Sequence, residues 1–353
     1  MKNLKHMKAI LYLTVGVMLL NANTLIAQDS LVNGQAIEVK QKVWATIFAS
    51  YYTTVNGDYK PKSAFEMPTA LFGYSATFSD KLKATLIYDV TRTTNAIKVT
   101  DENGNQLNVS YNEGSKYTAF LKMAEIKYSP VNFVDVRIGQ LLNTQYLTTQ
   151  DKFWGYRYIY FTYQEVHRYG NPADFGAQID LKYGDKLLNQ LSVTNGDGPF
   201  KNQDQEGKFL YANNIEYYPI KGIVLKLYGD YSPKSDTAKL AKDKYAISAF
   251  AGYKTNKFRF AAEYNKVINN GYRKNSSYYG FSTFGSYTIN AKFDILLRYD
   301  YINRSATLNL EKSHLIIVGV QYQPIKNLLC SINIRNLSPS DRLMVYGNFG
   351  ITF

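Results

Sequence analysis

Residues 174–183 read DFGAQIDLKY, and apolar and polar positions alternate along this segment from Phe175 to Tyr183. Successive side chains of a β-strand point to opposite faces of a sheet, so the segment would have one apolar and one polar face. Residues 82–92 (LKATLIYDVTR) and 291–302 (AKFDILLRYDYI) repeat the pattern. After residue 30, no stretch keeps the i, i+3, i+4, i+7 apolar spacing that is typical of an amphipathic helix. The sequence therefore predicts an all-β protein.

A soluble β-sandwich would alternate in the same way, but three features favour a barrel that spans a membrane. The alternating runs cover about 10–13 residues, whereas strands of soluble proteins average about 5–6. Aromatic residues stand near the ends of the apolar faces, for example Tyr183, Tyr253 and Tyr301, as in the girdles of membrane barrels. The chain ends with the alternating run FGITF at 349–353, which resembles the C-terminal signal of bacterial outer-membrane proteins.

Sixteen alternating segments can be counted, and the connections between them alternate strictly between long and short. The short connections contain turn-forming residues such as Ser79-Asp80-Lys81 and Thr255-Asn256. This pattern predicts a transmembrane antiparallel β-barrel of about 16 strands, with short turns and both chain ends on one side of the membrane. The predicted strands are 41–53, 69–79, 82–92, 117–128, 133–140, 173–184, 187–195, 208–218, 223–232, 243–254, 257–268, 277–288, 291–302, 313–323, 327–336 and 341–353.

The longest connection covers residues 141–172 and is the third of the long ones. Trp154 to Tyr163 (WGYRYIYFTY) could form a strand there, which would make the strand count odd, so we place it within the connection. A connection of this length is usually functional or disordered, and its many aromatic residues argue against disorder. We expect this loop to fold toward the pore and to narrow it.

The strand 117–128 has an ambiguous phase. Phe120, Ile126 and Tyr128 alternate as a lipid-facing set, but the same phase aims Lys122 at lipid. A lysine at the middle of the bilayer costs roughly 2–4 kcal/mol. Either the phase or the depth of this strand must therefore be different.

The composition and the first residues limit the class of protein. With one Cys among 353 residues, the chain has no internal disulfide framework and no cysteine-based metal site. A mean hydropathy of −0.30 and the lack of a long apolar run after residue 30 argue against a helical membrane protein. Residues 1–27 read as a signal peptide, with a basic start, an apolar run at 9–20 and cleavage after Ala27, or alternatively after Ala22. Residues 28–353 then form the barrel domain.

The predicted inward faces carry nine basic and nine acidic residues, so the wall alone predicts little ion selectivity. The connection 141–172 adds Lys152, Arg157 and Arg168 against Asp151 and Glu165, an excess of one positive charge. Salt at physiological strength screens charges beyond about 8 Å, so only charges at a constriction should matter. We therefore predict that Lys152, Arg157 and Arg168 line the pore and set its selectivity. The basic wall residues are Lys83, Arg137, Lys182, Lys226, Lys244, Arg259, Arg298, Arg335 and Arg342, and the acidic ones are Asp89, Asp135, Asp174, Asp180, Glu216, Asp230, Glu263, Asp294 and Asp300.

The sequence offers little support for catalysis or metal binding. His167 lies in the long connection and His314 follows Ser313, but no Asp or Asn is placed beside either one to orient it. Residues 101–105 (DENGN) are similar to the start of a calcium loop but lack the glutamate that should follow. We expect no catalytic site, metal or cofactor.

The middle of the chain resembles the phosphate-selective porin O and P family. Residues 137–140 (RIGQ) end the strand before the long connection, 174–178 (DFGAQ) open the next strand, and 195–196 (NG) close the strand after that. The order and spacing of these three pieces match the central pattern of the family. The resemblance implies a 16-stranded, trimeric porin with basic pore residues that favour anions, and Arg137 is the charged position that it carries over.

These observations predict an outer-membrane porin of a Gram-negative bacterium, exported by its signal peptide, through which small hydrophilic solutes or ions diffuse. We expect a mild preference for anions, with phosphate as one candidate solute. The expected partners are outer-membrane lipid and lipopolysaccharide, small anions and two further copies in a homotrimer. Nucleic acid is not expected, because the lysines are spread through turns and loops. A structural or adhesive barrel with an occluded pore is the first alternative, and an outer-membrane hydrolase is the second.

Overall fold

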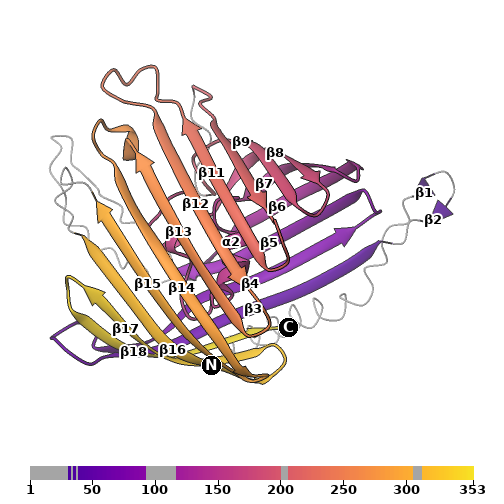
Figure 1. Cartoon of the computed structure of the whole chain (residues 1–353). Helices are drawn as coiled ribbons and strands as arrows, with labels where there is room; N and C mark the ends of the chain where they lie inside the picture. Colours follow the sequence, from indigo (N-terminus) through magenta and orange to yellow (C-terminus); the bar gives the residue numbers. More distant parts are fainter. Residues whose placement is uncertain (1–30, 33–34, 37–38, 93–116, 200–205, 305–311) are drawn as a thin grey trace, which may run out of the picture.

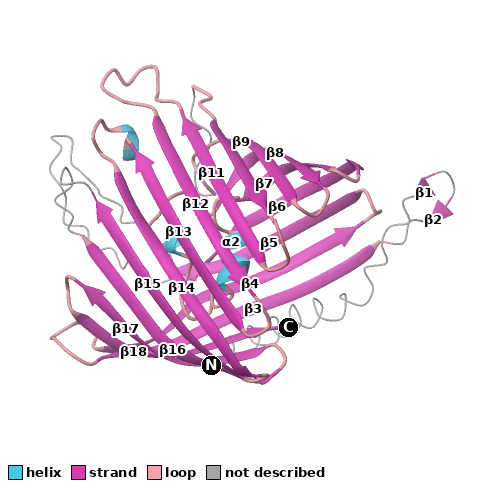
Figure 2. Ribbon diagram, in the orientation of Figure 1, coloured by secondary structure: helices cyan, strands magenta, loops and turns pink. Residues whose placement is uncertain are grey.

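The computed structural model describes residues 31–353 except for 33–34, 37–38, 93–116, 200–205 and 305–311 (Figure 1). Sixteen antiparallel strands, β3 to β18, close into one barrel (Figure 2), and the prediction of sixteen strands is confirmed. The last strand, β18, pairs with β3 to close the barrel, with Asn348 opposite Ser50. The predicted signal peptide, 1–27, and residues 101–105 lie outside the described residues.

The strands of the barrel are long, as expected for segments that cross a bilayer at a tilt. β4 differs most from its predicted bounds, because its pairing with β3 continues beyond Thr69 to Ser63 past a bulge, where Met67 and Pro68 of β4 stand opposite one residue of β3. A small separate ladder, β1 (Leu31–Val32) with β2 (Gln35–Ala36), precedes the barrel. The barrel strands are β3 (Lys40–Thr54), β4 (Ser63–Thr77), β5 (Leu82–Arg92), β6 (Tyr117–Val131), β7 (Val134–Leu142), β8 (Ala173–Tyr183), β9 (Leu187–Thr194), β10 (Leu210–Tyr217), β11 (Ile223–Ser232), β12 (Lys244–Lys254), β13 (Phe258–Ile268), β14 (Tyr278–Asn290), β15 (Phe293–Arg304), β16 (Ser313–Ile325), β17 (Leu328–Ser338) and β18 (Arg342–Thr352).

The two rims of the barrel differ in their connections (Figure 1). One rim, the short-turn end, holds the tight turns, such as 184–186, 255–257 and 326–327, together with the start of β3 and the end of β18. The opposite rim, the long-loop end, holds the other connections, including 143–172 between β7 and β8. Two short helices, α2 (Thr149–Trp154) and α3 (Tyr163–Val166), lie in that connection, and the 3₁₀ turn η2 (Asn270–Tyr272) lies between β13 and β14. No helix in the described ranges is long and apolar enough to cross a membrane.

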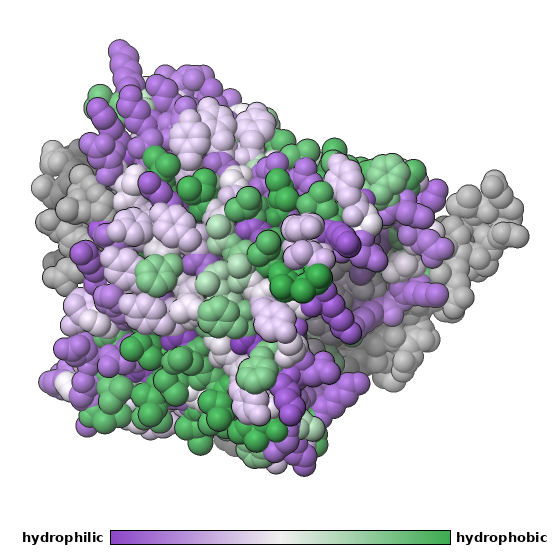
Figure 3. Space-filling view, viewed as in Figure 1, coloured by the Kyte–Doolittle hydropathy of each residue, from purple (hydrophilic) through white to green (hydrophobic). Residues whose placement is uncertain are grey.

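Every second side chain of each strand points outward, and the outward side chains are largely apolar. Outward residues such as Ile332, Leu227 and Phe260 are more than half exposed, and green and pale residues cover much of the face in Figure 3. Aromatic rings pair near the short-turn end, for example Phe293 with Tyr322 at 4.8 Å between centroids. This surface fits the hydrocarbon region of a bilayer.

A bulge in β6 resolves the ambiguous phase of that strand. Ile87 of β5 pairs with Met123 and the next residue pairs with Leu121, so Lys122 is the extra residue. Lys122 points inward, and its Nζ lies 2.7 Å from the Oδ2 of the buried Asp89. The placement of Phe120 on the lipid face was wrong, because the bulge reverses the phase and puts Phe120 opposite the inward Asp89.

Candidate functional site

The connection 143–172 lies inside the barrel and packs against one side of its wall. Trp154, Tyr156, Tyr158 and Ile159 form one buried cluster with inward side chains of β11 to β16. We call the inward surface of β10 to β18 the covered wall. Its apolar members in this cluster are Val224, Phe250, Ala261, Phe284, Leu296, Leu315 and Ile317.

A glycine of the covered wall makes room for a ring of the loop. Tyr163 of α3 donates a hydrogen bond of 2.8 Å to the carbonyl of Tyr301. A Cβ on Gly280 would lie 1.9 Å from the Tyr163 hydroxyl, so any larger residue at 280 would push α3 off the wall. The loop and the wall are therefore fitted to each other.

Four basic residues of the covered wall bind backbone carbonyls of the loop. Hydrogen bonds from charged donors contribute about 1.5–3 kcal/mol each. These hydrogen bonds therefore stabilise the position of the loop against the covered wall. They join Lys226 Nζ to Thr144 at 2.5 Å and to Gln145 at 3.0 Å, Arg259 to Trp154 at 2.5 Å, Arg298 to Phe161 at 2.6 Å and Arg335 to Ile159 at 2.6 Å.

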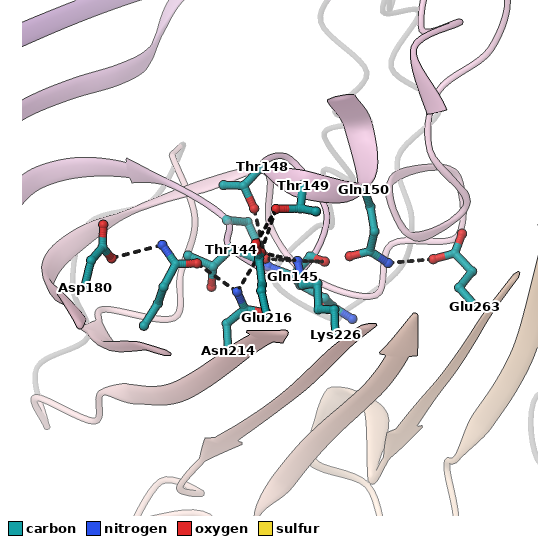
Figure 4. Close-up of polar contacts among 12 residues, drawn as sticks. Thr144, Gln145, Thr148, Thr149, Gln150, Asp180, Asn214, Glu216, Lys226 and Glu263 are labelled. Atoms are coloured by element: carbon teal, nitrogen blue, oxygen red, sulfur yellow. Dashed lines mark hydrogen bonds and ion pairs between the residues drawn. The ribbon is translucent and has the colours of Figure 1, made fainter. Parts of the chain in front are cut away.

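Acidic residues of the covered wall accept hydrogen bonds from side chains of the loop (Figure 4). Glu216 accepts from the Thr149 hydroxyl at 2.7 Å, and Glu263 accepts from Gln150 at 2.8 Å and from Gln164. Asp294 of β15 accepts in the same way from Tyr156, at 3.0 Å. Hydrogen bonding to the carboxylates offsets part of the cost of removing them from water.

The opposite side of the lumen, which we call the open wall, is formed by the inward faces of β4 to β8. Arg137 lies here, with Nε 2.7 Å from Asp180, Nη1 2.8 Å from Glu125 and Nη2 3.9 Å from Asp135. Lys182 lies 2.7 Å from the same Asp135. The Lys182 and Arg137 side chains are 40% and 25% exposed, against 1% for Arg298 of the covered wall, so water reaches the open wall.

The charges of the open wall nearly cancel. The cluster holds three carboxylates, Glu125, Asp135 and Asp180, and three cations, Lys127, Arg137 and Lys182, so its net charge is 3 − 3 = 0. A chain of hydrogen bonds links this cluster to the covered wall: Asp180 accepts from Gln190 at 2.9 Å, and Asn214 donates to Gln190 at 2.8 Å and to Glu216 at 3.1 Å.

The loop carries its own ion cluster. Arg157 donates to Asp151 at 2.9 Å and to both oxygens of Glu165, at 2.6 and 2.7 Å. Burial opposes the charged form of Arg157, but the two carboxylates outweigh it, and the pKa of the guanidinium is raised. With two carboxylates and one cation, the cluster has a net charge of 1 − 2 = −1.

The structure separates the four residues predicted to line the pore. Arg137 is in the ion cluster of the open wall, and Arg157 is in the ion cluster of the loop. Lys152 is exposed on α2, beside turns of the short-turn end. Arg168 is exposed in the last part of the loop, where its carbonyl accepts from Tyr278 at 2.9 Å. Of the four, only Lys152 and Arg168 have no carboxylate within 4.0 Å among the described residues.

The structure describes two of the three histidines, His167 and His314. Burial lowers the pKa of His167 to about 4, and its ring lies 4.6 Å from that of Tyr163. His314 Nδ1 lies 2.6 Å from the Tyr299 hydroxyl, whereas Ser313 donates to the carbonyl of Ser338. Neighbouring residues of a strand point to opposite faces, so Ser313 and His314 cannot form a catalytic pair. Within the described part of the chain, no group of three His, Cys, Asp or Glu residues could hold a metal ion.

Comparison with known proteins identifies the fold. Salmonella typhi OmpF, solved with daunomycin, superposes with a TM-score of 0.64 at 13% identity, over 89% of this chain and 97% of that chain. An anion-selective porin from Comamonas acidovorans gives 0.60 at 13% identity, over 90% and 100%. The trimer form of OmpT, an outer membrane protein of Vibrio cholerae, gives 0.59 at 12% identity, over 89% and 99%. No family model and no curated protein sequence matches the chain.

The chain therefore has the closed sixteen-stranded barrel fold of porin structures. At these identities the likeness concerns the fold alone. The closer resemblance to the phosphate-selective porin O and P family stays a prediction.

Proposed function

We propose that this protein is an outer-membrane porin through which small hydrophilic solutes diffuse between the loop 143–172 and the open wall. The observation that carries the proposal is the contrast across the lumen. The loop binds one wall through buried contacts, whereas the Arg137 and Lys182 side chains on the other wall are 25% and 40% exposed to water. Sixteen strands enclose more space than side chains fill, so an aqueous passage is expected.

The proposed selectivity is a mild preference for anions, with phosphate as a candidate. The clusters around Arg137 and Arg157 have net charges of 0 and −1, so those two arginines add little positive potential. Lys152 and Arg168 supply unpaired positive charge. One unit charge about 6 Å from an ion in water contributes roughly 0.7 kcal/mol, which is about a threefold bias.

The proposed setting is the outer membrane of a Gram-negative bacterium, reached by means of the signal peptide at 1–27. The apolar outer surface would contact lipid, and lysines of the long-loop end would contact lipopolysaccharide phosphates. The trimer form of OmpT supports a homotrimer. We propose no enzymatic activity.

A barrel with an occluded pore is the second candidate, and one observation favours it. The loop fills the covered side of the lumen with large buried side chains, including Trp154 and Tyr163. If the remaining passage were too narrow for ions, the protein would serve a structural or adhesive role instead.

Reconstitution in a planar bilayer tests the proposal. We expect stepwise conductance increments in symmetric salt and a reversal potential, under a salt gradient, that indicates a preference for anions of about threefold or less. Purified, folded protein that inserts without conductance would contradict the porin function and favour the occluded barrel. A preference for cations would contradict only the proposed selectivity.

A further inference from the structure

A groove at the short-turn end is not explained by passive diffusion alone. It lies where α2 of the loop meets three turns, which are 184–186, 218–222 and the turn that begins at Lys254. These turns are joined by backbone hydrogen bonds, from Tyr218 N–H to the carbonyl of Lys186 and from Lys254 N–H to that of Gly222, both 2.8 Å. The groove is therefore framed by turns that are hydrogen-bonded to one another.

The floor of the groove is apolar and held in place. Phe153 of α2 packs edge-on against Phe250, with ring centroids 5.4 Å apart. A Cβ on Gly252 would lie 2.6 Å from the Phe153 ring, so the glycine allows the end of the ring to approach β12 closely. Pro219 and Ile220 continue this floor, and Ile220 is 64% exposed.

The edge of the groove is basic. Lys152, Lys186, Lys221 and Lys254 line it, with Asp185 as its acidic member, so its net charge is 4 − 1 = +3. In the portion of the chain that the structure describes, none of these lysines has a carboxylate within 4.0 Å. Several wall cations elsewhere in the lumen, such as Arg137 and Arg298, bind carboxylates, and Arg335 binds a loop carbonyl, whereas the four lysines of the groove have no such carboxylate partner among the described residues.

We propose that the groove binds small amphipathic anions, in which a phosphate or carboxylate is attached to an apolar group. The lysines would hold the anionic group, and Phe153, Pro219 and Ile220 would contact the apolar part. This inference rests on the proposed channel function and specifies a class of solute that the channel retains at its short-turn end. An inorganic anion would use the lysines alone, and an apolar cation would meet four like charges.

Single-channel recording with phenyl phosphate as the probe tests the proposal. Added on the short-turn side, phenyl phosphate should reduce the current at concentrations about tenfold lower than inorganic phosphate needs, because only the former also buries an apolar ring. Phenyltrimethylammonium, which keeps the ring and reverses the charge, should not block. Conductance without any probe reports on the channel function separately.

Substitutions test the basic edge and the apolar floor of the groove separately. Lys221→Gln with Lys254→Gln should weaken the block by both phosphates about tenfold, since each unit charge contributes about threefold. Ile220→Ser should weaken only the block by phenyl phosphate. Lys292→Gln with Lys326→Gln, on turns away from the groove, is the matched control and should leave the block unchanged. An unaltered block in Lys221→Gln/Lys254→Gln, or an equal block by phenyltrimethylammonium, would overturn the groove while leaving the channel function intact.

Discussion

The covered wall and the open wall use the same kinds of residue for different purposes. Arg298 on the covered wall is 1% exposed, binds Asp300 at 2.8 Å and donates to a loop carbonyl. Arg137 on the open wall is 25% exposed and lies among three carboxylates. Both are arginines on inward strand positions, yet one fixes a loop and the other faces the passage. The position of the loop, rather than residue type, therefore decides what a lumen charge does.

Removal of the loop should have the largest effect. Replacing residues 146–169 with a short Gly/Ser connection would remove the loop side chains from the lumen, so that only wall side chains occupy it. The wider passage should raise the conductance at least about twofold. Planar bilayer recording measures it. Replacing 233–243, a connection at the same rim between β11 and β12, is the control and should change conductance little. An unchanged conductance in the 146–169 variant would show that the loop does not restrict the passage.

The two arginines should respond differently to the same substitution. Arg298→Met leaves Asp300 buried beside Ser282 without its cation, which should lower the free energy of unfolding by about 3–5 kcal/mol. Arg137 is 25% exposed, and Lys127 and Lys182 remain beside Asp135 when it is replaced. Arg137→Met should therefore cost less stability, and the reversal potential should move toward cations. Thermal unfolding in detergent and the reversal potential measure the two effects. Equal losses of stability would contradict the distinction between the walls.

The half-buried histidine of the loop should make the stability of the folded protein sensitive to acid. His167 has a pKa of about 4 in the folded protein and an ordinary value of about 6.5 when unfolded. Between these values the unfolded chain binds more protons, so stability should fall as the pH is lowered from 6.5 toward 4. In His167→Gln this part of the decline should be missing, whereas in His314→Gln, outside the loop, it should persist. Melting temperatures measured across this range would contradict the account if wild type and His167→Gln declined in parallel.

The smallest expected effect concerns the outer face behind the covered wall. Cys330 has the same orientation on β17 as Ile332 and Ile334, which are 71% and 50% exposed on the outer surface. It should therefore resist water-soluble maleimides and react with an apolar thiol reagent that enters the membrane. Mass spectrometry of the intact protein measures the labelling. Rapid reaction with the water-soluble reagent would mean that β17 has the opposite phase.

The strand count and the phase of most strands could be predicted from the sequence, because period-two alternation is a local property. The bulge at Lys122 could not, since it depends on the pairing of β5 with β6 and on the buried Asp89. The lysine in an otherwise apolar position was the available signal. This lysine indicated that the predicted phase of the strand 117–128 was incorrect, but it did not indicate that the cause was a bulge.

The candidate site was less predictable than the barrel. Charges on the inward faces were recognised, but their partners were not, because the contacts of Arg298 and Arg335 with residues 159–161 span more than a hundred positions of sequence. One signal did exist in the sequence. Leu296 interrupts a polar face between Asp294 and Arg298, and such a position is buried only if something inside the barrel covers it.

The accessibility of single cysteines tests the central claim, that water and solutes pass along the open wall and not along the covered one. In a Cys330→Ser background, Lys182→Cys places a thiol on the open wall, and Ser282→Cys places one on the covered wall, where Ser282 is 1% exposed. A charged methanethiosulfonate reagent added to the conducting channel should react rapidly at position 182 and change the current, and should leave the protein with cysteine at 282 unaffected. Equal reaction at both positions, or reaction at 282 alone, would contradict the account.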